Sequence, residues 1–115
     1  MAGFIAVNSE KEFSMSSVLF DAIVNYSKSY LEELSAELAH EIYEPIDEAG
    51  MFVVGLTEAS SDDFKLVFVA LKRGYESCLK QGKCGNLDQT LFIDVMNMWK
   101  DILVAMEEDE RQQVA

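Results

Sequence analysis

The sequence predicts a mainly α-helical fold, a three- or four-helix bundle to which residues 4–7 and 51–56 could add a short two-stranded β element. Half of the 115 residues are apolar, which is enough to form one hydrophobic core. Apolar residues recur at helical spacing over three long stretches of the chain. The residues that end helices fall between these stretches, at Pro45, Gly50 and Gly82. One helical domain over residues 14–107 is therefore expected.

The N-terminal third is expected to pass from an extended segment into helix. Residues 1–13 form the extended segment, with a short apolar run followed by a polar connection. Helical spacing begins near residue 15 and continues to about residue 44, as one long helix or as two abutting helices. Pro45 is predicted to end this stretch, because proline disfavours helical geometry in the preceding residue and has no N–H group. Three hydroxyl side chains are candidates for the N-cap: Ser14, Ser16 and Ser17.

Residues 51–56 are apolar, and their periodicity does not decide their structure. They could form a buried strand that pairs with residues 4–7, or a packed connection. The connection is slightly preferred.

The next helix has the clearest sequence pattern. Ser60 offers a hydroxyl cap, and Asp62 and Asp63 complement the positive end of the helix dipole. Gly82 is the expected residue at the C-terminal end. The predicted buried face consists of Phe64, Val67, Phe68, Leu71, Tyr75, Cys78 and Leu79.

The last helix is predicted over residues 87–107, with Asn86 as its N-cap and Gln89 completing a capping box. Two adjacent apolar rows cover more than half of its circumference, so the helix is either central in the fold or part of an interface. A homodimer through residues 87–107 is the expectation for an interface. Residues 108–115 are predicted to be a frayed or disordered acidic tail, because acidic residues are unfavourable at a helix C-terminus.

Charge is strongly segregated along the chain. Between Ser29 and Phe64 there are ten carboxylates and no Lys or Arg. At ~100° per residue, five of them would lie on one face of a helix, and neighbouring like charges cost such a helix roughly 0.2–0.5 kcal/mol per pair. Either function or tertiary packing must therefore maintain the stripe. The stripe, with Tyr30 as an aromatic anchor beside it, is the candidate partner-binding site: Tyr30, Glu33, Glu37, Glu41, Glu44 and Glu48.

Two simpler interpretations of the stripe remain open. The carboxylates could be only a solvated, solubilising face. They could also be neutralised inside the fold by the basic residues of the third helical segment, which are Lys65, Lys72, Arg73, Lys80 and Lys83.

The formal net charge of −12 indicates which molecules the chain would meet. It repels nucleic acid and anionic lipid, so a basic protein is the expected partner, with no nucleic acid and no membrane. The apolar run at residues 4–7 is shorter than a signal peptide requires. A cytoplasmic protein is expected.

No pattern of residues predicts catalysis, a metal or a cofactor. Glu37 and His40 match a Glu-x-x-His metal motif, but such sites need two motifs and the chain has one histidine. The expected role of His40 is to offset surface charge. Cys78 and Cys84 are expected to be free thiols, although a chain reversal after Gly82 would also allow a disulfide. An enzyme is not expected.

These features predict a non-catalytic acidic interaction module that binds and masks a basic protein, in the manner of an immunity protein or an antitoxin-type inhibitor of a nuclease toxin. The alternative is an adaptor or secretion-type chaperone that binds an apolar helix of its partner through residues 87–107. A third class is an enzyme or ligand sensor built around a cavity in the bundle.

Overall fold

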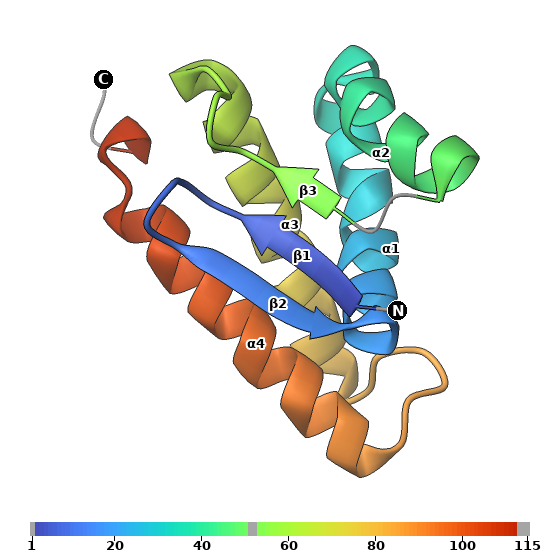
Figure 1. Cartoon of the computed structure of the whole chain (residues 1–115). Coiled ribbons are helices and arrows are strands. Elements are labelled where there is room, and N and C mark those ends of the chain that lie inside the picture. Colours follow the sequence, from blue (N-terminus) through green and yellow to red (C-terminus); the bar gives the residue numbers. More distant parts are fainter. Residues whose placement is uncertain (1, 51–52, 113–115) are drawn as a thin grey trace.

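The computed structural model describes residues 2–50 and 53–112, in which four α-helices accompany a small sheet (Figure 1). The predicted mainly α fold with a short β element is confirmed. In chain order the elements are β1 (Ala2–Ala6), β2 (Glu12–Ser16), α1 (Ser17–Leu34), α2 (Ala36–Ala49), β3 (Val53–Gly55), α3 (Ser61–Gln81), α4 (Gln89–Glu108) and the 3₁₀ turn η1 (Glu110–Gln112).

The sheet has the strand order β2-β1-β3. Strands β1 and β2 are antiparallel, with Ile5 opposite Phe13, whereas β1 and β3 are parallel, with Ile5 opposite Val54. The two-stranded element anticipated from residues 4–7 and 51–56 therefore exists as the β1–β3 pair. The preference for a connection at 51–56 is wrong over residues 53–55; residues 51 and 52 lie outside the described part of the chain.

Strand β2 was not predicted, because its residues were assigned to a polar connection and the start of a helix. Phe13 and Met15 alternate with three exposed polar residues, which is the period of a strand. The turn before it is set by Asn8, whose Oδ1 accepts hydrogen bonds from the backbone N–H groups of Glu10 (2.9 Å) and Lys11 (2.8 Å). This turn pairs β2 with β1.

The core lies between the sheet and the helices α1, α3 and α4, which lie behind the sheet in Figure 1. Phe20, Phe64 and Trp99 are its largest fully buried side chains, and Ile5 of β1 packs with them. Full burial of a side chain of this kind stabilises a fold by roughly 1.5–3 kcal/mol. Helix α2 packs mainly on α1 and stands apart from this layer.

Helices α1 and α2 decide between two alternatives that the sequence left open, and they correct the predicted end of the stretch. They are two abutting helices separated at Ser35, whose hydroxyl caps α2 by accepting a hydrogen bond from Leu38 N–H (3.2 Å). Pro45 does not end the helical stretch, because α2 continues to Ala49 before Gly50, which has a left-handed φ of 66°. Pro45 is exposed and lies in the last half of a short helix, where water can solvate the carbonyl that loses its partner.

Helix α3 follows its predicted ends. The Ser60 hydroxyl accepts a hydrogen bond from Asp63 N–H (3.2 Å), and Gly82 terminates the helix with a φ of 70°. Leu71 is buried as predicted, but Leu79 is 56% exposed, so its assignment to the core is wrong. Consecutive helical residues point ~100° apart. Cys78 occupies the buried direction, and Leu79 therefore faces solvent.

Helix α4 begins with Asp88 as its cap, whose Oδ1 accepts a hydrogen bond from Leu91 N–H (2.8 Å), so the prediction of Asn86 as the cap is wrong. Val95, Trp99 and Ile102 are fully buried, so the wide apolar arc of α4 is covered within the monomer. This removes the reason for expecting a homodimer through residues 87–107, which stays a prediction.

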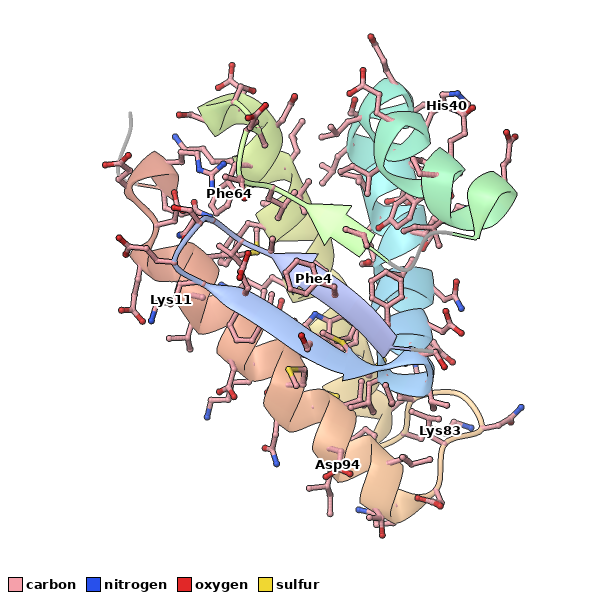
Figure 2. The ribbon with its side chains drawn as sticks, in the orientation of Figure 1. Phe4, Lys11, His40, Phe64, Lys83 and Asp94 are labelled. Carbon is pink, nitrogen blue, oxygen red and sulfur yellow. The ribbon has the colours of Figure 1, made fainter. Side chains whose placement is uncertain are left out.

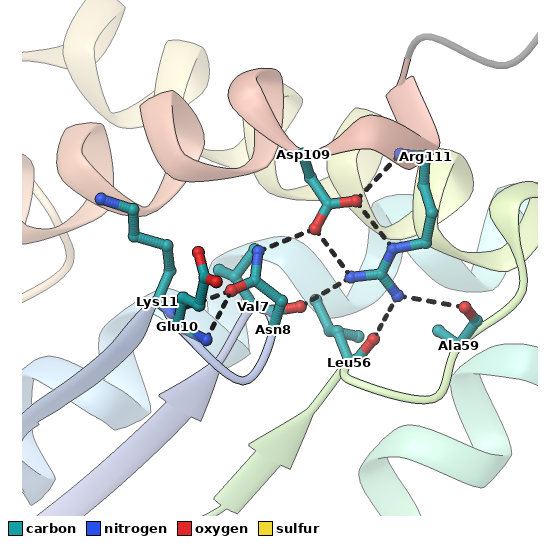
Figure 3. A network of polar contacts seen from close by, with 8 residues as sticks. All are labelled: Val7, Asn8, Glu10, Lys11, Leu56, Ala59, Asp109 and Arg111. Atoms are coloured by element: carbon teal, nitrogen blue, oxygen red, sulfur yellow. Dashed lines mark hydrogen bonds and ion pairs between the residues drawn. The ribbon is translucent and has the colours of Figure 1, made fainter.

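The chain after α4 is not frayed over residues 109–112, contrary to the expectation for this segment. Asp109 is buried and receives hydrogen bonds from Asn8 Nδ2 (2.8 Å) and Arg111 Nε (2.9 Å), as Figure 3 shows. Arg111 in turn donates to the carbonyl oxygens of Val7 and Ala59. The sequence did not indicate the Asp109–Arg111 pair, because the acidic residues around Asp109 are exposed. Residues 113–115 lie outside the described part.

A candidate protein-interaction surface on α2

The outer face of α2 carries an acidic ridge, which we define as Glu37, Glu41, Glu44 and Glu48. All four side chains are exposed. Their spacing of 4, 3 and 4 residues places them on one side of the helix, opposite the direction of the buried Ala39. The sequence-based prediction of an acidic helical face therefore holds for these four residues.

Glu33 does not belong to the ridge, which corrects the predicted five-residue stripe. It lies on α1, and the break at Ser35 separates it from α2. The physical reason is Ser35: its extended backbone ends the first helix, and its hydroxyl accepts a hydrogen bond from a backbone N–H of the next. A serine in a continuous helical pattern was the available signal.

Tyr30 is also separated from the ridge. It is half-buried on α1 and lines a hollow with four residues of α3, among them Arg73 and Lys80. The aromatic residue beside the ridge is instead Tyr43, which is buried and whose hydroxyl lies 3.0 Å from the Ser27 hydroxyl. Burial raises the pKa of Tyr43, so this side chain stays neutral.

One flank of the ridge borders a hollow of about 260 Å³ between α1 and α2. Lys28 Nζ lies 2.6 Å from Asp47 Oδ2 and 5.8 Å from the centre of the Tyr43 ring. The hydrogen bond to Asp47 raises the pKa of Lys28. His40 of α2, labelled in Figure 2, places Nε2 2.5 Å from Glu44 Oε2. Its role in offsetting surface charge stays a prediction.

The ridge is only slightly neutralised by the fold. Among the described residues, Asp47 pairs with Lys28 and Glu44 contacts His40, whereas the ion pairs there include no basic partner for Glu37, Glu41 or Glu48. Lys83, one of the basic residues considered as an internal partner, lies at the end of the molecule opposite His40 (Figure 2). Internal pairing with α3 therefore does not account for these three carboxylates.

The sequence-based site omitted Lys28, Tyr43 and Asp47. Asp47 follows His40 and Glu44 at helical spacing, so it could have been placed on this flank from the sequence. The pairing of α2 with α1, which brings Lys28 to Asp47, had no sequence signal.

The described residues include neither a metal-binding cluster nor a membrane-spanning helix. Among them, no group of three or more His, Cys, Asp and Glu side chains is arranged to hold a metal ion. No helix within residues 2–50 and 53–112 has the length and apolar character to cross a membrane.

Comparison with known proteins gives a likeness in fold. No protein-family model and no curated protein matches the sequence. One chain in the solved structure of a CdiA-CT toxin from Burkholderia pseudomallei E479 in complex with its cognate CdiI immunity protein is similar, with a TM-score of 0.75 and 19% identity. The alignment covers 96% of this chain and 98% of that chain. At this identity the likeness establishes that the two chains share a fold over nearly their whole lengths.

Proposed function

We propose that this chain is an immunity protein, a non-catalytic cytoplasmic inhibitor that binds and masks a basic protein toxin. The observation that carries the proposal is the acidic ridge, three of whose four carboxylates have no basic partner, whether Lys, Arg or His, among the described residues. Like charges at these spacings destabilise a helix, and within the described residues no basic side chain pairs with Glu37, Glu41 or Glu48. A cationic partner would compensate these negative charges.

The shared fold supports the same class of function. The similar chain belongs to a complex between a toxin and its immunity protein, and fold alone does not assign either role to the chain described here. Its net charge of −12 favours the inhibitor, because a protein that covers a cationic surface must present the opposite charge. Complementary charge also speeds association, which suits an inhibitor that must reach a toxin before its target does.

The adaptor or chaperone alternative needs an apolar surface on α4. Val95, Trp99 and Ile102 face the core, while the exposed Ile93 and Val104 are separated on the outer face by Asn97 and Lys100. The exposed part of α4 is therefore mixed in polarity, and the ridge is the better candidate surface.

The test uses the proteins encoded on either side of this coding sequence, expressed with any toxic activity disabled. We expect a basic one to bind with a Kd below ~100 nM, and its association to slow as salt is raised. The triple variant Glu37→Gln, Glu44→Gln, Glu48→Gln should weaken binding about tenfold or more, mainly through slower association. The matched control neutralises three exposed glutamates away from α2: Glu12, Glu107 and Glu108.

Stability separates a binding surface from a structural one. The ridge variant should be as stable as the wild type, or up to about 1 kcal/mol more stable, because three repulsive pairs disappear. Urea denaturation measures this. Failure of both neighbouring proteins to bind, or equal weakening by the ridge and control variants, would refute the proposed function.

A further inference from the structure

A groove of about 480 Å³ runs between α2 and the β3–α3 connection, on the flank of the ridge opposite Lys28. Its floor is apolar, because Leu38, Leu56 and Val67 line it and are themselves almost fully buried. Ile42 and Ala59 are half-buried at its sides. Its volume falls within the range of ligand pockets, roughly 300–1,000 Å³, and it is large enough to admit an apolar side chain.

Both walls of this groove are acidic. Glu41 of the ridge stands on the α2 side, and Glu58 and Asp63 stand on the opposite side. Glu37 extends the acidic wall into an adjoining hollow of about 180 Å³, which Glu41 and Asp63 also line. No Lys or Arg is among the described residues that line either space. The acidic segment between Ser29 and Phe64 thus folds back on itself, so that Glu41 faces Glu58 and Asp63 across the groove.

The wall opposite α2 is held in place from behind. Arg111 donates hydrogen bonds from Nη1 to the backbone carbonyls of Leu56 and Ala59. The guanidinium is itself engaged by Asp109 and lies 3.9 Å from the centre of the Phe64 ring. These contacts fix the β3–α3 connection before any partner arrives, so less ordering cost accompanies binding.

We propose that this groove is the docking point for the basic partner: an apolar side chain enters it, and adjacent Lys or Arg side chains pair with Glu41, Glu58 and Asp63. The inference rests on the proposed function and deepens it by naming the recognised feature. An apolar core surrounded by a polar rim is the usual anatomy of a protein interface. Exclusion of water by the anchor strengthens the surrounding ion pairs. The acidic rim disfavours a second copy of this acidic chain as the occupant.

The experiment uses three blocked peptides of equal length, otherwise made of Gly and Ser. The first has a Leu between two Lys, the second replaces the Leu with Ser, and the third replaces both Lys with Gln. Methyl NMR titration reports on Leu38, Ile42, Leu56 and Val67. We expect the first peptide to shift these methyl signals and to bind about tenfold more tightly than either control, a difference of ~1.4 kcal/mol.

Two variants test the groove in the full chain. Gly55 lines the groove, and a Cβ there would meet no atom within 4 Å, so Gly55→Leu should fill the groove without disturbing the fold. The double variant Glu41→Gln, Glu58→Gln removes charge from both walls. The matched control is Glu12→Gln, Glu107→Gln. We expect the groove variants to lose about tenfold or more in affinity for the first peptide, and the control to change it less than about twofold.

The outcomes distinguish the two proposals. Equal binding of the first two peptides would identify a purely electrostatic surface, and equal binding of the first and third would identify an apolar-ligand site; either overturns the groove inference. A basic neighbouring protein that binds Gly55→Leu as tightly as the wild type also overturns it, while the proposed function stands. If the groove binds the peptide but the chain binds no basic neighbouring protein, the proposed function is refuted instead. Circular dichroism and urea denaturation verify that Gly55→Leu folds.

Discussion

Arg111 and Asp109 form a buried, bidentate ion pair, in which Arg111 Nε lies 2.9 Å from Asp109 Oδ1 and Arg111 Nη2 lies 3.0 Å from Asp109 Oδ2. The side chains are 14% and 5% exposed. Asn8 donates to the same carboxylate, and Arg111 also reaches the Val7 carbonyl at 2.8 Å (Figure 3). The pair therefore ties the C-terminal turn to the β1–β2 turn and the β3–α3 connection, three segments far apart in sequence.

This pair predicts how stability depends on pH. Hydrogen bonds from Arg111, and then from Asn8, hold the pKa of Asp109 well below its usual range. Since the folded pKa is lower than the unfolded value of about 3.9, the stabilisation is complete above that value and is lost as pH falls toward the folded pKa. Asp109→Asn should therefore destabilise the protein strongly at pH 7, and the deficit relative to wild type should shrink below about pH 4.

Urea denaturation at pH 7, 5 and 3 measures the deficit of Asp109→Asn, with the exposed Asp101→Asn as the control. Removing one partner of a buried pair typically costs about 3–5 kcal/mol when a charge is left uncompensated. A deficit that stays constant from pH 7 to pH 3 would show that Asp109 contributes through shape and not through its charge.

Leu71 and Leu79 of α3 provide a matched pair of substitutions. Leu71 is 6% exposed and Leu79 is 56% exposed. Leu71→Ala should cost about 2–5 kcal/mol through lost burial and the resulting cavity, whereas Leu79→Ala should cost less than ~0.5 kcal/mol. Chemical denaturation of both variants checks this. Comparable losses would mean that Leu79 is buried in solution.

Gly74 lies where α1 and α3 approach closely. A Cβ at this position would lie 2.7 Å from the backbone oxygen of Tyr26 and 2.9 Å from the Trp99 ring. Gly74→Ala should therefore destabilise the protein by about 1–3 kcal/mol, less any gain in helix propensity. The control is Gly55→Ala, where a Cβ has open space. A thermal melt in which Gly74→Ala matches the control would exclude this close packing.

Cys78 and Cys84 should react slowly while the protein is folded. Both are buried free thiols with their sulfur atoms 3.5 Å apart. Burial raises the pKa of both thiols, that of Cys84 to about 12, so little thiolate forms at pH 8. A thiol reagent should modify them quickly only after urea is added, whereas a cysteine introduced by Lys80→Cys, at an exposed position, should react at once. Fast labelling of the native wild type would contradict the prediction.

The helices whose local signals agree could be predicted from the amino-acid sequence alone. Ser60 and Gly82 delimit α3 because a capping hydroxyl and a glycine free to adopt positive φ act within one turn of the chain. The acidic face of α2 was predictable for the same reason, since residues three and four apart share a helix face whatever else they contact. These properties depend only on neighbours in sequence.

Contacts between segments far apart in the sequence became evident only in the folded structure. The pairing of β3 with β1 depends on a parallel partner nearly 50 residues away, and short apolar runs do not reveal it. From the sequence, Asp109 was assigned to an acidic tail, whereas in the structure it is buried against Arg111 and Asn8. The acidic groove likewise required Glu58 and Asp63 to face Glu41 across two elements. Periodicity records the direction of a side chain on its own element, whereas long-range packing selects the side chain opposite it.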